Sequence, residues 1–320
     1  MPELPEVEVV RAGLHPAVTG AVIERVEVLE PRSLRRHDGP VDDFVDRLGE
    51  ATILSAVRRG KFLWFPFAAA DGDTSHALVA HLGMSGQVLL RERHADDDRL
   101  LRIRLDLAHP THGDIRLAFV DQRIFGSMAL DTLEPTPDGE PAGYSGSRLL
   151  GHDAEQGDEP QDPAPWLSSI PHQVAHIARD PLDPAFDEHA FFARMASRGS
   201  GVKRALLDQG LVSGIGNIYA DESLWAAKIH FDQPCSSLTR GRVKLLLVEI
   251  RAVLYKALAE GGTSFDAQYV NVNGQSGYFA HSLNAYGQQG KPCPRCGTPI
   301  KRVSFMNRGS HFCPRCQRLR

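Results

Sequence analysis

Residues 293–316, CPRCGTPIKRVSFMNRGSHFCPRC, decide the fold of one end of this chain. They hold two Cys-x2-Cys pairs, Cys293 with Cys296 and Cys313 with Cys316, separated by sixteen residues. This spacing is typical of a four-cysteine zinc site. Four thiolates complete the tetrahedral coordination of Zn²⁺ and leave no open position, so we predict one structural zinc ion per chain. Two disulfides are the alternative, but no secretion signal is recognised, and a reducing compartment favours the metal.

The other end begins Met1-Pro2-Glu3-Leu4-Pro5-Glu6. If Met1 is removed, the nitrogen of Pro2 changes from a tertiary amide into a free secondary amine. An α-amino group has a pKa of roughly 7.7–8.0, so an unprotonated fraction exists near neutrality and can form a Schiff base with an electrophilic carbon. Glu3 and Glu6 are close enough in sequence to move protons. The alternative is that Pro2 simply opens a helix, because proline suits the first turn.

Several further motifs follow one another between these two ends. They are Arg59-Gly60-Lys61, His81-Leu82-Gly83-Met84-Ser85-Gly86, Asp121-Gln122-Arg123-Ile124-Phe125-Gly126, Gly214-Ile215-Gly216-Asn217-Ile218-Tyr219-Ala220 and Gly277-Tyr278-Phe279-Ala280. Together with the two ends, they resemble the bacterial formamidopyrimidine-DNA glycosylases of the Fpg/Nei family. The resemblance implies base-excision repair of double-stranded DNA that contains oxidised purines. It also implies a monomer in the bacterial cytoplasm, associated with the nucleoid and not with a membrane.

The resemblance implies catalytic roles for four residues. Pro2 would attack the sugar C1′ and displace the base, and Glu3 would protonate the ring oxygen. The resulting iminium acidifies the C2′ proton, so the two flanking phosphates would be eliminated in turn by a combined glycosylase and lyase. Lys61 would act in elimination or hold a phosphate, and Arg308 would grip the phosphates beside the flipped nucleotide. Without the resemblance, Lys61 could be an ordinary lysine at the end of a strand.

Seven residues are expected to contact DNA. Met84 and Phe125 would wedge into the base stack that the flipped nucleotide leaves, and Arg123 would bind the unpaired cytosine. On composition alone, Met84 and Phe125 would be core residues, but the adjacent glycines indicate exposed loop tips. The resemblance assigns the DNA backbone to four more residues, of which the first lies where a glycine turn enters a helix: Asn217, His81, Lys203 and Arg198.

Four features depart from the family pattern. Ile124 stands where arginine is usual, so one phosphate or minor-groove contact is missing from the pattern. Phe231 replaces a usual proline, and the acidic run at residues 95–99 replaces a histidine that relatives place against DNA. The segment 264–277 resembles the lesion-capping loop but differs enough that it does not give the base preference.

Charge is distributed unevenly along the chain. Residues 131–165 carry nine acidic residues against one arginine, a net charge of −8, so the remainder carries +4 of the formal total of −4. This stretch also holds eleven glycines or prolines, and such a composition predicts a disordered linker. The last thirty residues hold eight Lys or Arg and no Asp or Glu. This concentration of basic charge is typical of a surface that binds nucleic acid.

The apolar pattern predicts an α+β multidomain protein. A helix over residues 3–18 and short strands, among them 22–28, 61–65, 77–82 and 101–107, predict an N-terminal β-sandwich with flanking helices. Helical periodicity follows the linker, ending with a helix over 238–260. The resemblance adds a helix-two-turns-helix module and a β-hairpin zinc ribbon. The expected parts are the catalytic β-sandwich domain 2–131, the acidic linker insertion 132–184, the helix-two-turns-helix domain 185–285 and the zinc ribbon 286–320.

Two alternative functions remain open from the sequence. An endonuclease VIII-like glycosylase for oxidised pyrimidines would share the fold and the chemistry. It usually has glycine where Leu4 stands, and it lacks the full triad of Met84, Arg123 and Phe125. A noncatalytic protein that binds damaged DNA is the second alternative. Loss of Pro2 or Glu3 would favour it, and both residues are present.

Overall fold

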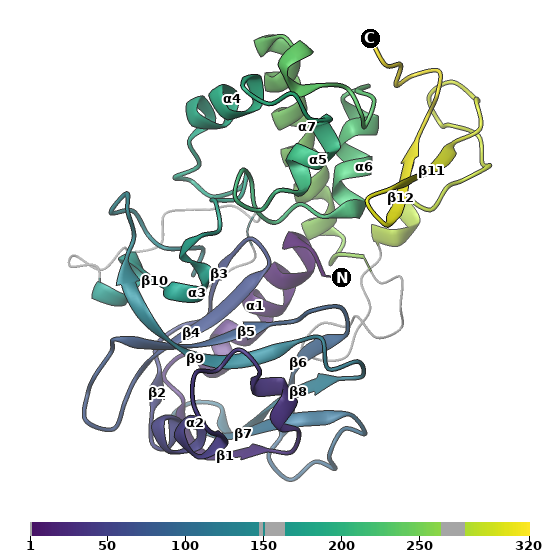
Figure 1. The fold of residues 1–320 in the computed structure, drawn as a ribbon. Coiled ribbons are helices and arrows are strands. Elements are labelled where there is room, and N and C mark those ends of the chain that lie inside the picture. The colour runs from purple at the N-terminus through teal and green to yellow at the C-terminus, as the bar shows by residue number, and fades with distance from the viewer. Residues whose placement is uncertain (1, 147–149, 151–163, 264–278) are drawn as a thin grey trace.

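The computed structural model describes residues 2–146, 150, 164–263 and 279–320. Figure 1 shows two lobes: a sheet-rich lobe from the N-terminal part of the chain, and a helical lobe with a small ribbon at its side. The predicted α+β class is therefore confirmed. Among the described residues, no helix combines the length and the apolar composition that crossing a bilayer requires.

Helix α1 (Leu4–Val18) connects the two lobes and contributes to both of their cores. At its start, the backbone N–H of Glu3 donates to the Glu6 carboxylate at 2.9 Å, which satisfies a donor that the helix itself cannot pair. Leu4 packs in the core of the helical lobe, whereas Val7 packs in the core of the sheet lobe. The predicted N-terminal helix is confirmed, and its first turn lies at the junction of the lobes.

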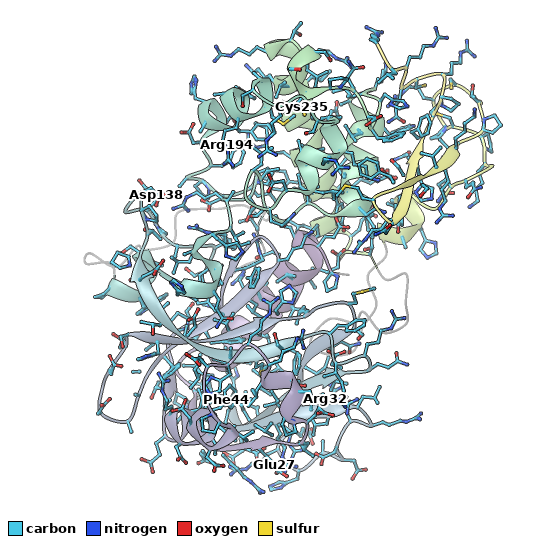
Figure 2. The ribbon with its side chains drawn as sticks, viewed as in Figure 1. Glu27, Arg32, Phe44, Asp138, Arg194 and Cys235 are labelled. Atoms are coloured by element: carbon cyan, nitrogen blue, oxygen red, sulfur yellow. The ribbon has the colours of Figure 1, made fainter. Side chains whose placement is uncertain are left out.

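The sheet lobe is one hydrogen-bonded path of strands in the order β10-β9-β5-β4-β2-β1-β7-β8-β6, with β3 paired to β4. The path folds over itself, so Phe65 of β4 and Phe119 of β8 share one apolar core; this is the predicted β-sandwich. Helix α2 (Val41–Leu48) packs on that core through Phe44, labelled in Figure 2. The strands are β1 (Val22–Val28), β2 (Thr52–Ile53), β3 (Val57–Arg59), β4 (Phe62–Ala68), β5 (His76–His81), β6 (Gly86–Glu92), β7 (Leu101–His109), β8 (Gly113–Asp121), β9 (Ser127–Pro135) and β10 (Ser169–Pro171).

The prediction of a disordered acidic stretch is wrong for residues 131–146. Its first residues extend strand β9, and Ala142 is buried in an apolar cluster against the sheet. Asp138, at the edge of the sheet lobe in Figure 2, forms an ion pair with Arg179 at 2.8 Å. Composition misleads here because the groups that order this stretch lie elsewhere in the sequence. Most of residues 147–163 lies outside the described part of the chain.

The helical lobe is built around helix α7 (Arg240–Ala259), which confirms the helix predicted over 238–260. Thr239 caps its N-terminus, and the chain leaves its C-terminus through two glycines with positive φ, Gly261 and Gly262, as expected for a helix end. The other helices are α3 (His172–Ala175), α4 (Glu188–Ala196), α5 (Val202–Leu207) and α6 (Asn217–Ala226). Helix α6 packs between α7 and the ribbon, and its N-terminus faces the sheet lobe.

The ribbon is an antiparallel hairpin of β11 (Lys301–Phe305) and β12 (Arg308–Phe312). Phe231 of the helical lobe supports it, with its ring centroid 5.6 Å from that of Phe305 and 5.2 Å from that of Phe312. A phenyl ring therefore gives the ribbon an apolar contact at the position where the family usually has proline.

A buried ion-pair network joins the lobes. Arg58 of β3 contacts Glu8 of α1 at 2.9 Å and Asp180 at 2.8 Å, and each of the three side chains is at most 3% exposed. Arg11 adds a second arginine against Glu8 at 2.8 Å. Asp180 lies two residues before Leu182, which packs in the helical core. Two arginines therefore neutralise two buried carboxylates, so the charges are balanced at the junction.

Candidate active site and zinc centre

A cavity of about 260 Å³ lies where the sheet lobe, the helical lobe and the ribbon meet. Each of the three parts supplies some of its lining. The lining residues are Lys61, Phe62 and His81 from the sheet lobe, Ile177 from the segment after α3 that packs on the sheet, Leu207, Gln209, Gly216 and Asn217 from the helical lobe, and Phe305, Met306 and Arg308 from the ribbon. Four of the residues that the sequence singled out therefore line one cavity: Lys61, His81, Asn217 and Arg308.

The Glu3 carboxylate is held by the N-terminus of α6. It accepts hydrogen bonds from the backbone N–H groups of Gly216 at 2.6 Å, Ile218 at 2.9 Å and Tyr219 at 3.3 Å. A Cβ on Gly216 would lie 2.3 Å from the Glu3 carboxyl carbon, so this close approach requires glycine. Burial raises the pKa of Glu3, against the opposing effects of the Lys61 charge and the backbone donors. A buried carboxyl with a raised pKa can hold a proton for general acid catalysis.

The N-terminal residues are fixed from a second side by Glu6. Besides the Glu3 backbone, this carboxylate accepts from the hydroxyl of Tyr219 at 2.6 Å and from the backbone and hydroxyl of Thr263 at 2.7 and 2.8 Å. Pro2 is buried beside them. Sequence reasoning missed Tyr219 and Thr263 as partners, since only the fold brings them to the first turn of α1. The start of the chain is therefore held by residues far away in sequence.

Lys61 reaches across the junction of the lobes. Its Nζ donates to the carbonyl of Ile215 at 2.8 Å, and burial lowers its pKa while the charge of Glu3 opposes that effect. Gln209, which the sequence analysis did not single out, donates to the same carbonyl at 2.9 Å and accepts from the N–H of Gly214 at 3.0 Å. Gln209 thus fixes the turn against which both Lys61 and Glu3 are placed.

Residues of α6 and β12 form one side of the cavity. Asn217 is buried, and its side-chain amide donates to the carbonyl of Gly309 at 3.0 Å. Arg308, next to that glycine, is exposed. Burial, with smaller contributions from Arg36 and Arg35, lowers the pKa of His81 to about 4. His81 is therefore neutral near pH 7, so its ring can form hydrogen bonds but carries no charge; its contact with DNA stays a prediction.

Two expected DNA contacts are already engaged within the protein. Lys203 is fully buried, and its Nζ pairs with Asp221 at 2.6 Å beneath β12. The structure therefore places this ammonium under the ribbon and away from the surface. Arg198 is partly exposed and pairs with Asp208 at 2.7 Å. Neither residue lines the cavity, and their assignment as DNA contacts stays a prediction.

The residues expected to fill the DNA stack lie on two adjoining loops. Met84 is 39% and Phe125 is 49% exposed, and Arg123 is exposed as well. The prediction of exposed loop tips is thus confirmed. Gly83 has a φ of +62°, and a Cβ there would lie 2.3 Å from the backbone of Phe125, so only glycine permits the two loops to touch. The loops that carry Met84 and Phe125 therefore touch at Gly83.

The acidic run near residue 97 serves the sheet itself. Asp97 pairs with Arg104 at 3.1 Å and with Arg116 at 2.9 Å, and Asp98 pairs with Arg91 at 3.0 Å. These carboxylates therefore neutralise arginines of neighbouring strands, which explains acidic residues at a place where the family pattern has a histidine. The segment 264–277, with its resemblance to the lesion-capping loop, lies outside the described residues.

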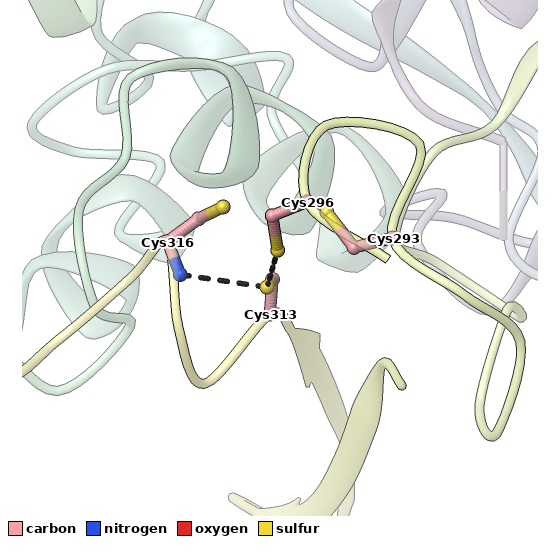
Figure 3. Close-up of side chains that lie close together, drawn as sticks. All are labelled: Cys293, Cys296, Cys313 and Cys316. Carbon is pink, nitrogen blue, oxygen red and sulfur yellow. Dashed lines mark hydrogen bonds between the residues drawn. The ribbon is translucent and has the colours of Figure 1, made fainter. Parts of the chain in front are cut away.

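The four predicted zinc ligands converge in the ribbon (Figure 3). The sulfur atoms of Cys293, Cys296, Cys313 and Cys316 all lie within 4.8 Å of one another, and each cysteine is a free thiol. Ligands at about 2.3 Å around a tetrahedral Zn²⁺ are roughly 3.8 Å apart, so the cluster fits one zinc ion. The alternative of two disulfides is wrong.

The first zinc knuckle is anchored to the end of α6. The indole N–H of Trp225 donates to the sulfur of Cys293 at 3.4 Å. Arg295 stacks over the Trp225 ring at 4.1 Å and donates to the Trp225 carbonyl at 3.0 Å. Groups that contact metal ligands help to orient them. Trp225 contacts a predicted zinc ligand at the C-terminal end of α6, and the N-terminus of the same helix binds Glu3.

Comparison with known sequences gives three matches along the chain. Residues 1–128 match the formamidopyrimidine-DNA glycosylase N-terminal domain, residues 177–268 match the formamidopyrimidine-DNA glycosylase H2TH domain, and residues 290–319 match the zinc finger found in FPG and IleRS. The H2TH match begins inside the linker predicted over 132–184, and the predicted domain boundaries stay predictions.

Whole-length relatives and solved structures agree with these matches. A formamidopyrimidine-DNA glycosylase of Leifsonia xyli is 61% identical over 319 residues, covering 100% of both chains. One from Thermobifida fusca is 50% identical over 321 residues, covering 99% of this chain and 97% of the relative. The structure of Lactococcus lactis Fpg with DNA containing an abasic site has a TM-score of 0.75 at 29% identity, covering 99% of each chain. Its complex with DNA containing N7-benzyl-Fapy-dG has a TM-score of 0.76 at 30% identity, covering 99% of this chain and 100% of the other. This chain belongs to the formamidopyrimidine-DNA glycosylase family.

Proposed function

We propose that this protein is a DNA glycosylase with abasic-site lyase activity that removes oxidised purines, 8-oxoguanine and formamidopyrimidines, from duplex DNA. The observation that carries the proposal is the buried Glu3 carboxylate, held by three backbone N–H groups of α6 beside the buried Pro2. Relatives named formamidopyrimidine-DNA glycosylases support the glycosylase activity. The lyase activity rests on the chemistry of the chain's own residues. We further infer that the protein acts as a monomer in the cytoplasm, at the nucleoid.

The reaction requires the damaged nucleotide to leave the helix. Turning it out costs a few kcal/mol of unstacking, which insertion of Met84 and Phe125 into the gap would offset. Both side chains are exposed on adjoining loops, and Arg123 beside them can bind the unpaired base. The flipped nucleotide would then enter the cavity between the lobes.

Base release begins after removal of Met1. The lone pair of the Pro2 nitrogen forms a bond to C1′ while the bond from C1′ to the base breaks and the base takes that electron pair. Glu3, whose pKa is raised by burial, delivers its proton to the sugar ring oxygen. The Pro2 nitrogen, which became a cationic ammonium when it bonded to C1′, gives its N–H proton to the departing base. The bond from C1′ to the ring oxygen then breaks, and the regained nitrogen lone pair completes an iminium between Pro2 and C1′.

Strand cleavage follows from the iminium. Its positive charge acidifies the C2′ proton, and Lys61, whose pKa is lowered by burial, is suited to remove that proton. The electrons expel the 3′ phosphate. In a second elimination, loss of the C4′ proton expels the 5′ phosphate, and hydrolysis of the remaining iminium frees Pro2 and leaves a one-nucleoside gap. Arg308, exposed at the cavity, would bind these phosphates through its planar guanidinium.

Borohydride trapping tests the proposal directly. The protein, with Met1 removed, is incubated with a duplex holding 8-oxoguanine opposite cytosine, and borohydride reduces the iminium to a stable amine adduct. We expect a covalent adduct whose peptide map places DNA on Pro2. Glu3→Gln is expected to slow base release by about 10²- to 10⁴-fold, and Pro2→Gly to weaken it. A protein that carries extra residues before Pro2 should release no base.

Each alternative gives a distinct result in this assay. A protein that binds the duplex but forms no adduct with any lesion is a damage-binding protein, and the proposal fails. Faster excision of thymine glycol than of 8-oxoguanine indicates the endonuclease VIII-like activity. An N-terminally extended protein that cleaves as fast as the processed one would refute the role of Pro2.

A further inference from the structure

The loop that carries Phe125 contains a strained residue. Ile124 has a φ of +56°, in the left-handed region that β-branched side chains rarely adopt. Such a conformation persists only where the surroundings enforce it, and it is found preferentially at functional sites. Ile124 lies between Arg123 and Phe125, the two side chains expected to enter the DNA stack. Its backbone conformation therefore sets the directions in which both of them project.

Asp121 fixes this loop from the inside. It is fully buried, and its carboxylate accepts from the backbone N–H groups of Arg123 at 3.0 Å and Gly126 at 2.6 Å. The hydroxyl of Ser85 donates to the same carboxylate at 2.5 Å. Asp121 thus pairs the amide donors of one loop and ties it to the loop that bears Met84.

Arg35 fixes the same loop from the outside. Its guanidinium donates to three consecutive carbonyls, those of Ile124 at 3.1 Å, Phe125 at 2.5 Å and Gly126 at 2.6 Å. Its neighbour Leu34 is buried in the sheet core, so the base of the arginine is anchored. A planar group with five N–H donors can span three carbonyls, which a lysine ammonium cannot do with the same fixed geometry.

We propose that Arg35 is a positioning residue for insertion into the DNA stack: it holds Ile124 in its left-handed conformation, so that Arg123 and Phe125 are already directed outward before DNA arrives. The inference rests on the proposed function. Asp121 accepts hydrogen bonds from the backbone N–H groups of the loop, and Arg35 donates hydrogen bonds to its carbonyls. Two side chains of opposite charge therefore satisfy backbone groups that strand pairing would satisfy in a sheet. Without Arg35, the strain at Ile124 would be relieved by movement of the loop, and the insertion-competent state would be less populated.

The test uses the full chain and a duplex with a tetrahydrofuran abasic-site analogue next to 2-aminopurine. This analogue cannot undergo base release, so binding is measured without chemistry. The fluorescence of 2-aminopurine reports unstacking when a side chain enters the helix. We expect Arg35→Ala to reduce the fluorescence change and to weaken lesion binding about tenfold, in proportion to the lost population of the competent loop. Binding to undamaged duplex should change little.

Arg32→Ala is the matched control. Arg32 lies three residues before Arg35, in the 3-10 helix η1 (Pro31–Leu34) that Arg35 directly follows; it is 73% exposed and pairs only with Glu30 among the described residues. Its removal should leave the fluorescence signal and the preference for lesion DNA unchanged. Figure 2 labels Arg32 on the sheet lobe. Thermal unfolding of both variants near the wild-type midpoint would exclude a general loss of structure.

A double variant separates positioning from direct contact with DNA. Asparagine tolerates the left-handed region better than isoleucine, so removal of Arg35 should cost less in an Ile124→Asn background than in the wild-type background. An equal cost in both backgrounds would mean that the guanidinium acts on DNA itself, and would overturn the proposal. A wild-type fluorescence change in Arg35→Ala would overturn it as well. Failure of the proposed function looks different, because the wild-type protein would then bind the analogue but release no 8-oxoguanine.

Discussion

His81 stands at the end of β5 with most of its ring buried, close to the positive charges of Arg36, Arg35 and Lys61. Burial above all lowers its pKa to about 4 from an ordinary value of 6.5. Between these two values the unfolded chain binds a proton that the folded protein does not bind. The free energy of unfolding must therefore fall as the pH falls through this window.

This linkage gives a prediction for His81→Gln. Urea unfolding at about pH 7.5 and about pH 5 should show a drop in stability for the wild-type protein and a smaller drop for the variant. His112→Gln, which removes an exposed histidine, should keep the full drop. If His81→Gln loses as much stability on acidification as the wild type does, the ring is not held neutral by burial.

For single residues, prediction from the sequence succeeded where a local motif indicated the surroundings of the side chain. Adjacent glycines correctly placed Met84 and Phe125 on exposed tips, and the cysteine spacing gave the zinc ligands. Gln209 and Tyr219 were missed as partners because they act through atoms that only the tertiary structure brings near. Lys203 was expected to contact DNA, but the structure places it in a buried ion pair with Asp221. Asp221 is eighteen positions away in sequence, and nothing near Lys203 in the sequence indicates this pair.

Helix α6 organises the site at the scale of elements. Its N-terminal N–H groups bind Glu3, and Asp221 accepts from the backbone N–H of His311 in β12 at 2.8 Å. Glu222 accepts from Ala285 and Tyr286, both at 2.8 Å, in the segment that leads to the ribbon. Trp225, at its end, contacts the zinc knuckle. One helix of ten residues therefore sets the positions of Glu3, strand β12 and the four-cysteine cluster.

Asp221→Asn should destabilise the protein by about 3–5 kcal/mol, because it leaves the fully buried ammonium of Lys203 without its counter-charge. Urea unfolding measures this loss. Combining it with Lys203→Met removes both charges, and the double variant should lose less than the sum of the two single losses. Strictly additive losses would show that the two side chains do not interact.

Cys296→Ser should lose zinc and lesion-DNA binding together, since the metal supplies the folding free energy of a ribbon this small. Metal content by mass spectrometry and binding of the abasic-site analogue check this prediction. Cys235→Ser is the control, because Cys235 lies in the helical core, away from the zinc cluster, and zinc content should stay at one ion per chain. A Cys296→Ser protein that keeps full zinc and full DNA affinity would contradict the structural role of the site.

Element prediction was most reliable where periodicity or capping was strong, as in α1 and α7. The prediction of disorder was wrong for residues 131–146. Low hydrophobicity and many prolines indicate disorder only when the segment has no partner elsewhere in the chain. Here Asp138 forms an ion pair with Arg179, and Ala142 packs in an apolar cluster against the sheet. The departure at Phe231 could be recognised in the sequence, but its use as a support for the ribbon could not.

At the scale of the whole molecule, the lobes are joined by polar as well as apolar contacts. Arg58 pairs with a carboxylate from α1 and with one from the segment entering the helical lobe. Asp180 also accepts from the N–H of Gly60 at 3.3 Å, directly before Lys61. The network that joins the lobes therefore also fixes the turn that carries a predicted catalytic lysine.

Arg58→Met should lower the free energy of unfolding by about 3–5 kcal/mol, because buried carboxylates lose a partner. Arg25→Met is the matched control: this arginine is 62% exposed and pairs with Glu27 on the surface, so its loss should cost at most about 1 kcal/mol. Denaturant unfolding of both variants makes the comparison. Equal, small losses would show that the network contributes little to the junction.

The bond between Glu3 and α6 limits how this polypeptide can be divided. Glu3, the predicted proton donor, lies at the start of the chain, but the amides that hold it belong to the helical lobe, the first of them 213 positions later in the sequence. If the two halves were produced as separate molecules, neither would hold the Glu3 carboxyl in its buried site until they re-associated. The geometry of the Glu3 site therefore depends on both halves of the chain being present together.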